Sequence, residues 1–215
     1  MRKNLLNVFE ECKCFYGELN WWPADNPYEV VLGAILTQNT NWSNVTLSIM
    51  RLKKSGNISP EKIEVMDIEE LKIFIKSSGF YNRKAVSIKR VTSFINRNLG
   101  GNIEDIAKLG IGIARRKLLE LKGIGCETAD SILLYAANMP IFVVDAYTIR
   151  FLGRMWACKK KGYNEVQKVL QDSFPHDINL YKEFHAQIVE HSKQICKKKP
   201  LCSNCFLKDA CLRDV

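Results

Sequence analysis

The sequence of 215 residues contains no long apolar segment. A membrane-spanning helix needs about 20 consecutive apolar residues, and charged or polar residues interrupt every stretch before that length. The segment 1–10 begins with basic residues, but acidic and polar side chains interrupt its apolar residues before they are long enough for the core of a signal peptide. These absences predict an intracellular, cytoplasmic protein that does not contact a membrane.

Convincing β-strand patterns are also absent, because the one candidate run, residues 141–144, is short and isolated. Apolar residues instead recur at helical spacing, and the longest such segments are 26–37, 43–52, 61–77 and 82–98. The third segment divides near Asp67 into two short helices. Neither a low-complexity linker nor an internal repeat is present. We predict an all-α protein of about ten helices with short connections.

Acidic residues are fewer than basic ones, 23 against 32, so the formal net charge is +9. This excess favours a polyanionic partner, although many basic proteins bind no nucleic acid. Hydrophobic residues make up 47% of the chain, which is enough for one sizeable core or two small interlocked lobes.

Candidate metal ligands gather only at the C-terminus. The three histidines show neither metal-site nor triad spacing, and we assign them no role. A disulfide framework is not expected in a reducing compartment, and Cys12, Cys14, Cys126 and Cys158 are scattered. The other four, separated by gaps of five, two and five residues, are Cys196, Cys202, Cys205 and Cys211. Four thiolates suit a [4Fe–4S] cluster or zinc, and the spacing alone does not decide between them.

A pair of glycines, Gly123 and Gly125, stands between a basic helical segment and an apolar one. Two glycines separated by one apolar residue allow a tight turn with positive φ and a close backbone approach. The turn leads into a helix N-terminus, whose free N–H groups can hold a phosphate. An ordinary corner between two helices would leave the same Gly-x-Gly pattern.

The residues around this turn carry more information. Leu-x-Gly-Ile-Gly from Leu121, followed by Thr128-Ala129 and by Val143-Val144-Asp145, resembles the helix-hairpin-helix glycosylases of the endonuclease III superfamily. In that family the hairpin amides grip a DNA backbone phosphate, and the aspartate after the second helix serves catalysis. The resemblance implies that Asp145 is catalytic and that Lys122, Gly123 and Gly125 bind DNA. Asp145 also has the sequence context of a helix cap, and both roles can hold.

The resemblance further implies two all-α lobes. A six-helix barrel lobe with the helix-hairpin-helix would span residues 24–138. A second helical lobe would comprise residues 1–23 and 139–215, with an iron–sulfur cluster loop at 196–211. The expected partner is double-stranded DNA that contains a damaged or mismatched base. We expect a monomer, associated with the nucleoid if the source is prokaryotic.

One family residue is missing. Members that cut the DNA strand carry a lysine before the Thr-Ala pair, where it forms a Schiff base with the sugar. Here that position is Glu127, and a carboxylate cannot form an imine. We therefore predict a monofunctional glycosylase that leaves an abasic site. Glu127 would also complement the helix dipole in a first turn.

Three of the four tryptophans lie in two short segments, Trp21-Trp22-Pro23 and the run that ends at Trp42. Clustered tryptophan usually fills a core, but this arrangement resembles the 3-methyladenine glycosylase branch, in which stacked aromatics line the base pocket. Gln38 matches the family's glutamine that enters the gap left by the flipped base, and a plain helix cap is its alternative. A cationic alkylated purine would be attracted to aromatic faces.

The family's cluster loop has gaps of six, two and five residues, one residue more in the first gap than here. The resemblance nevertheless favours a [4Fe–4S] cluster over zinc, with exposed lysines nearby to meet DNA. Thymine/uracil mismatch and oxidised-pyrimidine glycosylases remain alternatives to the alkylated-purine prediction. A non-catalytic DNA-binding module and a redox or cluster-carrier protein are alternatives from other classes.

Overall fold

The computed structural model describes residues 4–156 and 162–212, which are helical and connected by loops, with no strand within these ranges. The all-α prediction is confirmed. Cys158 lies outside the described residues. No helix in these two ranges is both long and apolar enough to cross a membrane.

The chain divides into two compact units: Trp22–Met139, and Met1–Trp21 together with Pro140–Val215. They are called the continuous unit and the discontinuous unit below.

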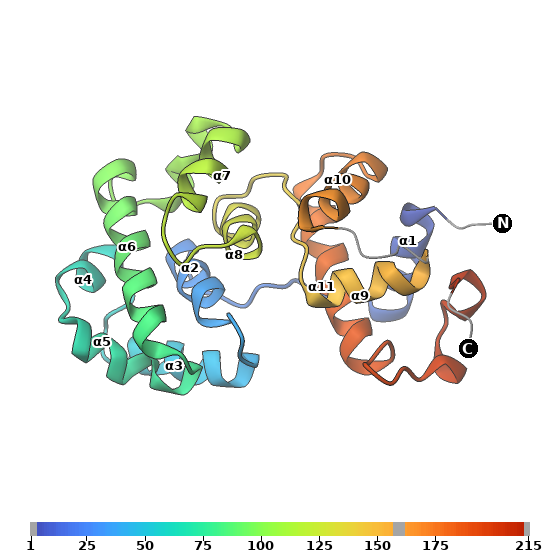
Figure 1. Cartoon of the computed structure of the whole chain (residues 1–215), viewed down its shortest axis with the longest axis horizontal. Helices are drawn as coiled ribbons and strands as arrows, with labels where there is room; N and C mark the ends of the chain where they lie inside the picture. The colour runs from blue at the N-terminus through green and yellow to red at the C-terminus, as the bar shows by residue number, and fades with distance from the viewer. Residues whose placement is uncertain (1–3, 157–161, 213–215) are drawn as a thin grey trace. The chain divides into compact units, whose positions relative to one another are not determined.

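The continuous unit is a bundle of helices followed by the hairpin (Figure 1). Its α-helices and short helical turns, in chain order, are α2 (Pro27–Leu36), α3 (Trp42–Lys54), α4 (Pro60–Val65), α5 (Ile68–Ile75), η1 (Lys76–Ser78), α6 (Tyr81–Leu99), η2 (Ile103–Leu109), α7 (Ile111–Leu119) and α8 (Cys126–Ser131). Helix α8 continues directly into one π-helical turn, η3 (Ile132–Ala136).

Polar side chains fix the starts of the first four of these helices. In each, the residue before the helix accepts a hydrogen bond from a backbone N–H in the first turn, and these N-caps are Asn26, Asn41, Ser59 and Asp67. An N-cap of this kind contributes about 1 kcal/mol. The cap at Asp67 explains why the predicted division of the segment 61–77 falls at this residue.

Helix α2 forms the centre of the continuous unit. Every residue from Tyr28 to Leu36 is buried, as expected for a helix that neighbours cover on all sides. Two polar contacts fix it inside the core: Tyr28 Oη lies 2.6 Å from Thr92 Oγ1 of α6, and Glu29 forms an ion pair with Lys53 of α3 at 2.8 Å. The loop that carries Gln38 follows the C-terminal end of α2.

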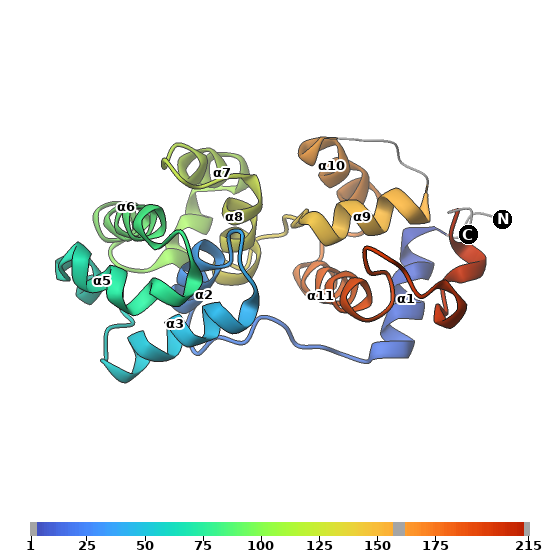
Figure 2. The same cartoon turned by 60° about the horizontal axis from the view of Figure 1, so that its bottom comes forward.

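The discontinuous unit contains the first and the last helices of the chain (Figure 2). These are α1 (Leu5–Tyr16), α9 (Ala146–Met155), α10 (Tyr163–Ser173) and α11 (Ile178–Gln194), followed by the 3₁₀ turns η4 (Cys202–Asn204) and η5 (Lys208–Ala210). Its core is rich in aromatic rings: Phe9 of α1 packs edge-on against Phe184 of α11, with ring centroids 5.6 Å apart. Such pairs add stability beyond the area they bury.

The run 141–144 is buried but is not a strand. Side chains of α10 take the place of a neighbouring strand: the Phe142 N–H donates to Gln171 Oε1 at 2.9 Å, and Gln167 Nε2 donates to the Phe142 carbonyl at 2.7 Å. Buried backbone groups need such partners. The segment leads directly into α9, whose N-cap is Asp145.

Candidate active site and cluster loop

The hairpin between α7 and α8 requires glycine at one of its two glycine positions. Gly123 has φ +100°, and a Cβ there would lie 2.1 Å from Ser87 Oγ of α6. Gly125 has φ −95° and open space around it. The exposed Lys122 is held through its backbone, because Arg90 of α6 donates to its carbonyl at 3.2 Å. Gly123 thus lets the hairpin lie directly on α6.

A buried ion pair fastens the two helices of the hairpin together. Arg115 of α7 donates to both carboxylate oxygens of Asp130 in α8, at 2.7 and 3.1 Å. The Asp130 side chain is fully buried. Two parallel hydrogen bonds of this kind also fix orientation. Glu127 stands exposed in the first turn of α8, where its charge complements the helix N-terminus.

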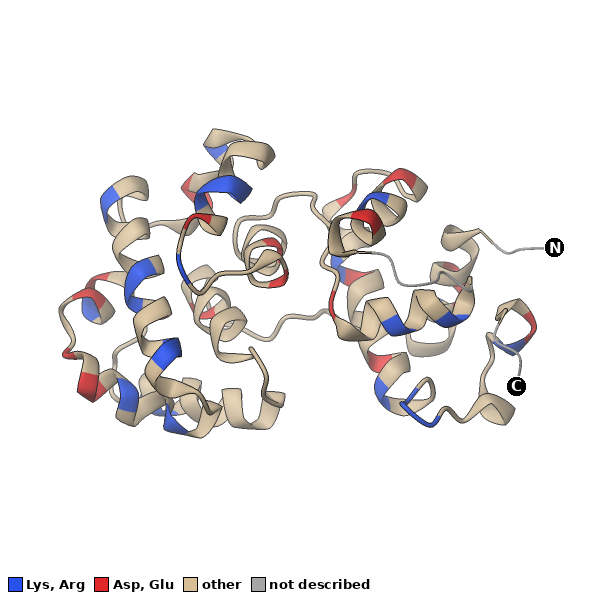
Figure 3. Ribbon diagram, in the orientation of Figure 1, with Lys and Arg blue, Asp and Glu red and all other residues tan. Residues whose placement is uncertain are grey.

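Gln38 lies just beyond α2 and contacts the hairpin. Its Nε2 donates to the Gly123 carbonyl at 3.1 Å and to Thr128 Oγ1 at 2.9 Å. The sequence run around Gln38 and the glycine turn, 85 positions apart, are therefore brought together within one unit. Figure 3 shows basic residues along α6 and α7, the helices beside this region.

Lys84 of α6 supports the same end of α2, and sequence reasoning missed it. Its buried ammonium donates to the carbonyls of Leu36, at 2.8 Å, and Ser78, at 2.6 Å. Burial lowers the pKa of Lys84 to about 8. Lys84, Ser87 and Arg90 follow one another at three-residue spacing, so one side of α6 supports both the Gln38 loop and the hairpin.

Two of the three predicted pocket tryptophans lie together in the continuous unit. Trp22 meets Trp42 edge-on, with ring centroids 5.3 Å apart, and lies 5.2 Å from the Tyr135 ring. Gly33 of α2 makes room for it, since a Cβ there would lie 3.2 Å from the Trp22 ring. A cavity of about 180 Å³ borders Trp22, Trp42 and the buried carboxylate Glu29. Trp21 belongs instead to the discontinuous unit, where its ring lies over His185 of α11.

Asp145 is the N-cap of α9. Its Oδ1 accepts hydrogen bonds from the Thr148 N–H at 2.7 Å and from Thr148 Oγ1 at 2.8 Å. Its Oδ2 lies 3.7 Å from His185 Nε2. Burial acts to raise the pKa of Asp145, but His185 and the Thr148 bonds outweigh it, and the pKa is lowered. Asp145 is therefore a carboxylate at neutral pH.

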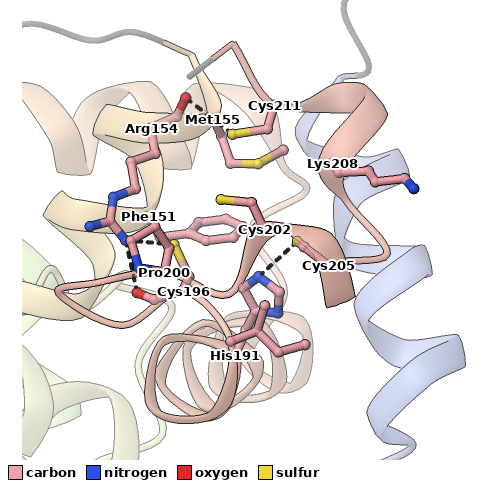
Figure 4. A pocket seen from close by; sticks show the side chains of 11 residues that line it. Phe151, Arg154, Met155, His191, Cys196, Pro200, Cys202, Cys205, Lys208 and Cys211 are labelled. Carbon is pink, nitrogen blue, oxygen red and sulfur yellow. Dashed lines mark hydrogen bonds between the residues drawn. The ribbon is translucent and has the colours of Figure 1, made fainter. Parts of the chain in front are cut away.

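The four C-terminal cysteines line one cavity of about 40 Å³ (Figure 4). Their sulfurs reach it from different sides, and Phe151 and Met155 of α9 supply apolar walls. Across the residues that the structure describes, no three His, Cys, Asp or Glu side chains come close enough to hold a single metal ion.

Side chains from α9 and α11 contact this cysteine set. Arg154 donates to Cys196 Sγ at 3.1 Å and to the carbonyl of Lys197 at 2.6 Å. His191 of α11 lies with Nε2 3.6 Å from Cys205 Sγ and Nδ1 3.0 Å from Tyr16 Oη of α1. Burial lowers the pKa of His191 to about 4, so its ring is neutral at neutral pH.

The remaining described cysteines stay apart from this cavity. Cys12 of α1 is buried, and this burial raises the pKa of its thiol to about 12. Cys14 is exposed and Cys126 is half-buried in the hairpin. The neighbouring lysines of the loop are exposed on its surface: Lys197, Lys198, Lys199 and Lys208.

The turn between α7 and α8 is formed by glycines, a carboxylate caps the following helix α9, and four cysteines lie in one loop. This combination is typical of helical DNA-repair proteins of the helix-hairpin-helix type. Residues 32–176 match the family described as HhH-GPD superfamily base excision DNA repair protein, and the chain belongs to it. The endonuclease III-related resemblance seen in the sequence is confirmed.

Individual relatives agree with this assignment. The chain is 49% identical over 201 residues to a provisionally named DNA repair glycosylase of Methanocaldococcus jannaschii, covering 92% of this chain and 91% of that protein. It is 28% identical over 187 residues to endonuclease III of Thermotoga maritima, with 86% and 83% covered. A solved 3-methyladenine DNA glycosylase of H. pylori, bound to 1,N6-ethenoadenine, superposes with a TM-score of 0.77 at 29% identity, covering 89% and 98%. The chain is thus similar throughout most of its length to DNA glycosylases.

Proposed function

We propose that this DNA glycosylase is monofunctional and releases an alkylated purine, such as 3-methyladenine, that has been flipped out of double-stranded DNA. The observation that carries the proposal is the aromatic cavity at Trp22 and Trp42. An alkylated purine is cationic, and aromatic faces attract a cation by about 0.5–2 kcal/mol per contact. The likeness to the 3-methyladenine DNA glycosylase supports the same substrate class.

Asp145 is the proposed catalytic carboxylate. Its ionised side chain is fixed at the start of α9 by Thr148. A carboxylate held in this way stabilises the positive charge that develops on the sugar as the glycosidic bond breaks. A cationic base leaves as a neutral molecule, so the departing base needs no proton from the protein.

Glu127 supports the monofunctional part of the proposal. It occupies the position before Thr128 where a lysine would attack the sugar, and no imine forms on a carboxylate. We assign both Glu127 and Trp21 to the border of the base pocket. Trp21 packs on His185 and belongs to the discontinuous unit, whereas Trp22 belongs to the continuous unit.

The proposed DNA contacts are Gln38, Lys122, Gly123 and Gly125. The exposed turn between α7 and α8 can bring backbone N–H groups to a phosphate, and Gln38 stands next to it. We propose that the protein acts as a monomer, with a DNA-gripping lobe at residues 24–138 and a second lobe at 1–23 and 139–215.

The proposed cofactor is a [4Fe–4S] cluster on Cys196, Cys202, Cys205 and Cys211. The fit lies in the donor set: four soft thiols face one cavity with apolar walls. The bound group would tie the loop 196–211 together and hold its exposed lysines in place. Arg154, which contacts Cys196 Sγ, offsets part of the negative charge of four thiolates.

The test is base release from duplexes that each carry one lesion: 3-methyladenine, 1,N6-ethenoadenine, uracil, thymine opposite guanine, or an oxidised pyrimidine. We expect release of the alkylated purines, with strand cutting only after alkali. Cutting without alkali would contradict the monofunctional assignment. Release of only uracil, mismatched thymine or an oxidised pyrimidine would contradict the substrate class, and DNA binding without any release would identify a binding module.

A further inference from the structure

The buried ring of His191 lies between Tyr16 of α1 and Cys205 of the cysteine loop. Its Nδ1 is 3.0 Å from Tyr16 Oη, and its Nε2 is 3.6 Å from Cys205 Sγ, within reach of a hydrogen bond to the large sulfur atom. Figure 4 shows the ring with this nitrogen directed at the Cys205 sulfur. All three residues belong to the discontinuous unit. Two polar contacts in series therefore connect the first helix to one of the proposed cluster ligands.

Aromatic packing fixes the position of the His191 ring. Phe151 of α9 meets it edge-on with ring centroids 5.7 Å apart, and Phe206, the residue after Cys205, does so at 5.2 Å. Phe206 is itself stacked on Phe15 of α1, with ring centroids 4.3 Å apart. The C-terminal end of α1 therefore contacts both the imidazole that faces the Cys205 sulfur and the loop residue next to that cysteine.

Binding of iron would fix the direction of the hydrogen bond at Cys205. A cysteine that ligates iron is a thiolate without a hydrogen, so its sulfur can only accept. Nε2 of His191 must then carry the ring hydrogen and donate it. His191 is 1% exposed, and burial disfavours a charged ring. In the neutral ring Nδ1 is therefore the acceptor, and the Tyr16 hydroxyl donates to it.

We propose that Tyr16 and His191 are positioning residues for the cluster: the Tyr16 hydroxyl orients the ring so that its Nε2–H donates to the Cys205 thiolate. This inference rests on the proposed [4Fe–4S] cofactor. Hydrogen bonds to the ligand sulfurs help to set the reduction potential of such a cluster. They stabilise the more negative, reduced state and so raise the potential. The pair therefore makes the bound cluster harder to oxidise.

The midpoint potential for one-electron oxidation of the cluster tests this role. It is measured by direct electrochemistry, in which the electron passes to the electrode, on the full chain with its iron and sulfide content determined. We expect His191→Leu, which removes the donor, to lower the midpoint potential. Tyr16→Phe should lower it by a smaller amount, because the ring still donates but is no longer polarised by the phenol. His191→Gln keeps an N–H donor and should lie closer to the wild type than His191→Leu.

Tyr28→Phe is the matched control for Tyr16→Phe. It removes a phenolic hydroxyl that contacts Thr92 in the continuous unit, so it should leave the potential of the cluster unchanged. The melting temperature of each variant is measured alongside, because loss of a buried hydrogen bond can lower stability in either unit. A lower melting temperature of Tyr16→Phe without a shift in potential would show a purely structural role and overturn the proposal.

The outcomes separate this inference from the proposals before it. Wild-type protein that binds no iron and sulfide would overturn the cofactor, and the role of the pair with it. A bound cluster with the same potential in the wild type, Tyr16→Phe and His191→Leu would overturn the role of the pair alone. Neither result depends on base release, so the test does not depend on the proposed substrate. Should His191→Leu fold poorly, the comparison of Tyr16→Phe with Tyr28→Phe decides.

Discussion

At the scale of single residues, Gly123 shows how the absence of a side chain can decide where a hairpin lies. Its φ of +100° and its closeness to Ser87 are two separate demands for glycine. Gly125, two positions later, faces neither demand. The sequence pattern treats the two glycines alike, and only the packing against α6 distinguishes them.

This difference gives a matched pair of substitutions. Gly123→Ala should lower the free energy of unfolding by about 1–3 kcal/mol, because the new Cβ meets Ser87 and the backbone conformation is strained. Gly125→Ala should leave the free energy of unfolding within about 0.5 kcal/mol of the wild type. Urea denaturation measures both. Equal effects of the two substitutions would contradict the packing described for Gly123.

Asp145 should affect stability as well as activity. Its pKa is lower in the folded protein than the ordinary aspartate value of about 3.9. Its contribution to stability is therefore present above that value and lost as the pH falls towards the folded-state pKa. We expect Asp145→Asn to abolish base release, keep DNA binding, and show a shallower loss of melting temperature between pH 5 and pH 3 than the wild type. Retained turnover would show that this carboxylate is not catalytic.

At the scale of elements, α6 has a role that its sequence does not reveal. Its apolar periodicity predicted the helix, found at Tyr81–Leu99. The positions that organise the candidate DNA surface are polar: Lys84, Ser87 and Arg90. Lys84 resembles any exposed lysine in the sequence, because its partners are backbone carbonyls from α2 and η1. Only the fold brings those carbonyls together.

Replacement of Lys84 should have a pH-dependent effect. The folded-state pKa of about 8 lies below the unfolded value of about 10.4, so burial of the charge opposes folding below pH 8, and this cost is relieved as the pH rises towards 10. The stability of the wild type relative to Lys84→Met should therefore increase between pH 8 and pH 10. Lys84→Met should also lose about 1–3 kcal/mol at neutral pH, because two buried carbonyls lose their donor. The exposed Lys76 provides the control substitution, Lys76→Met, and a pH-independent difference would contradict the assignment.

The sequence patterns predicted where helices begin better than they predicted which residues contact one another in the fold. Asn26 and Asp67 identify helix starts because an N-cap acts within four residues. The run 141–144 has the composition of a strand, yet amide side chains of α10 satisfy its backbone. The same limit applies to the site: Asp145 is marked by its neighbours in the chain, whereas His185 lies 40 positions away and is joined to it only by folding.

At the scale of the whole molecule, the loop 196–211, which carries the four C-terminal cysteines, has little hydrophobic core of its own. From Cys196 to Cys211 only Leu207 is buried. The guanidinium side chains of Arg150 and Arg154 donate hydrogen bonds to the backbone carbonyls of Cys196 and Lys197 and hold one end of the loop. The proposed [4Fe–4S] cluster would tie the rest of the loop together.

Removal of a ligand should therefore loosen this loop. Cys202→Ala is expected to lose bound iron and sulfide, to become sensitive to proteolysis between residues 196 and 212, and to melt at a lower temperature. The matched control is Cys14→Ala, which removes an exposed thiol. Metal analysis of the purified wild type should give about four iron atoms and four sulfides per chain, and stoichiometric zinc without iron would contradict the proposed cofactor.

The contact of α1 with α11 has a consequence for the order in which the protein is made. The continuous unit is a single stretch of chain, residues 22–139, so all of its packing partners are synthesised together and it can fold as it leaves the ribosome. Helix α1 is synthesised before it, yet Phe9 finds its partner Phe184 only when α11 has been translated. For most of synthesis, the first helix therefore carries an uncovered apolar face, Leu5, Val8, Phe9 and Cys12. A nascent chain stalled before α11 would be a client for chaperones, although its longer unit is already complete.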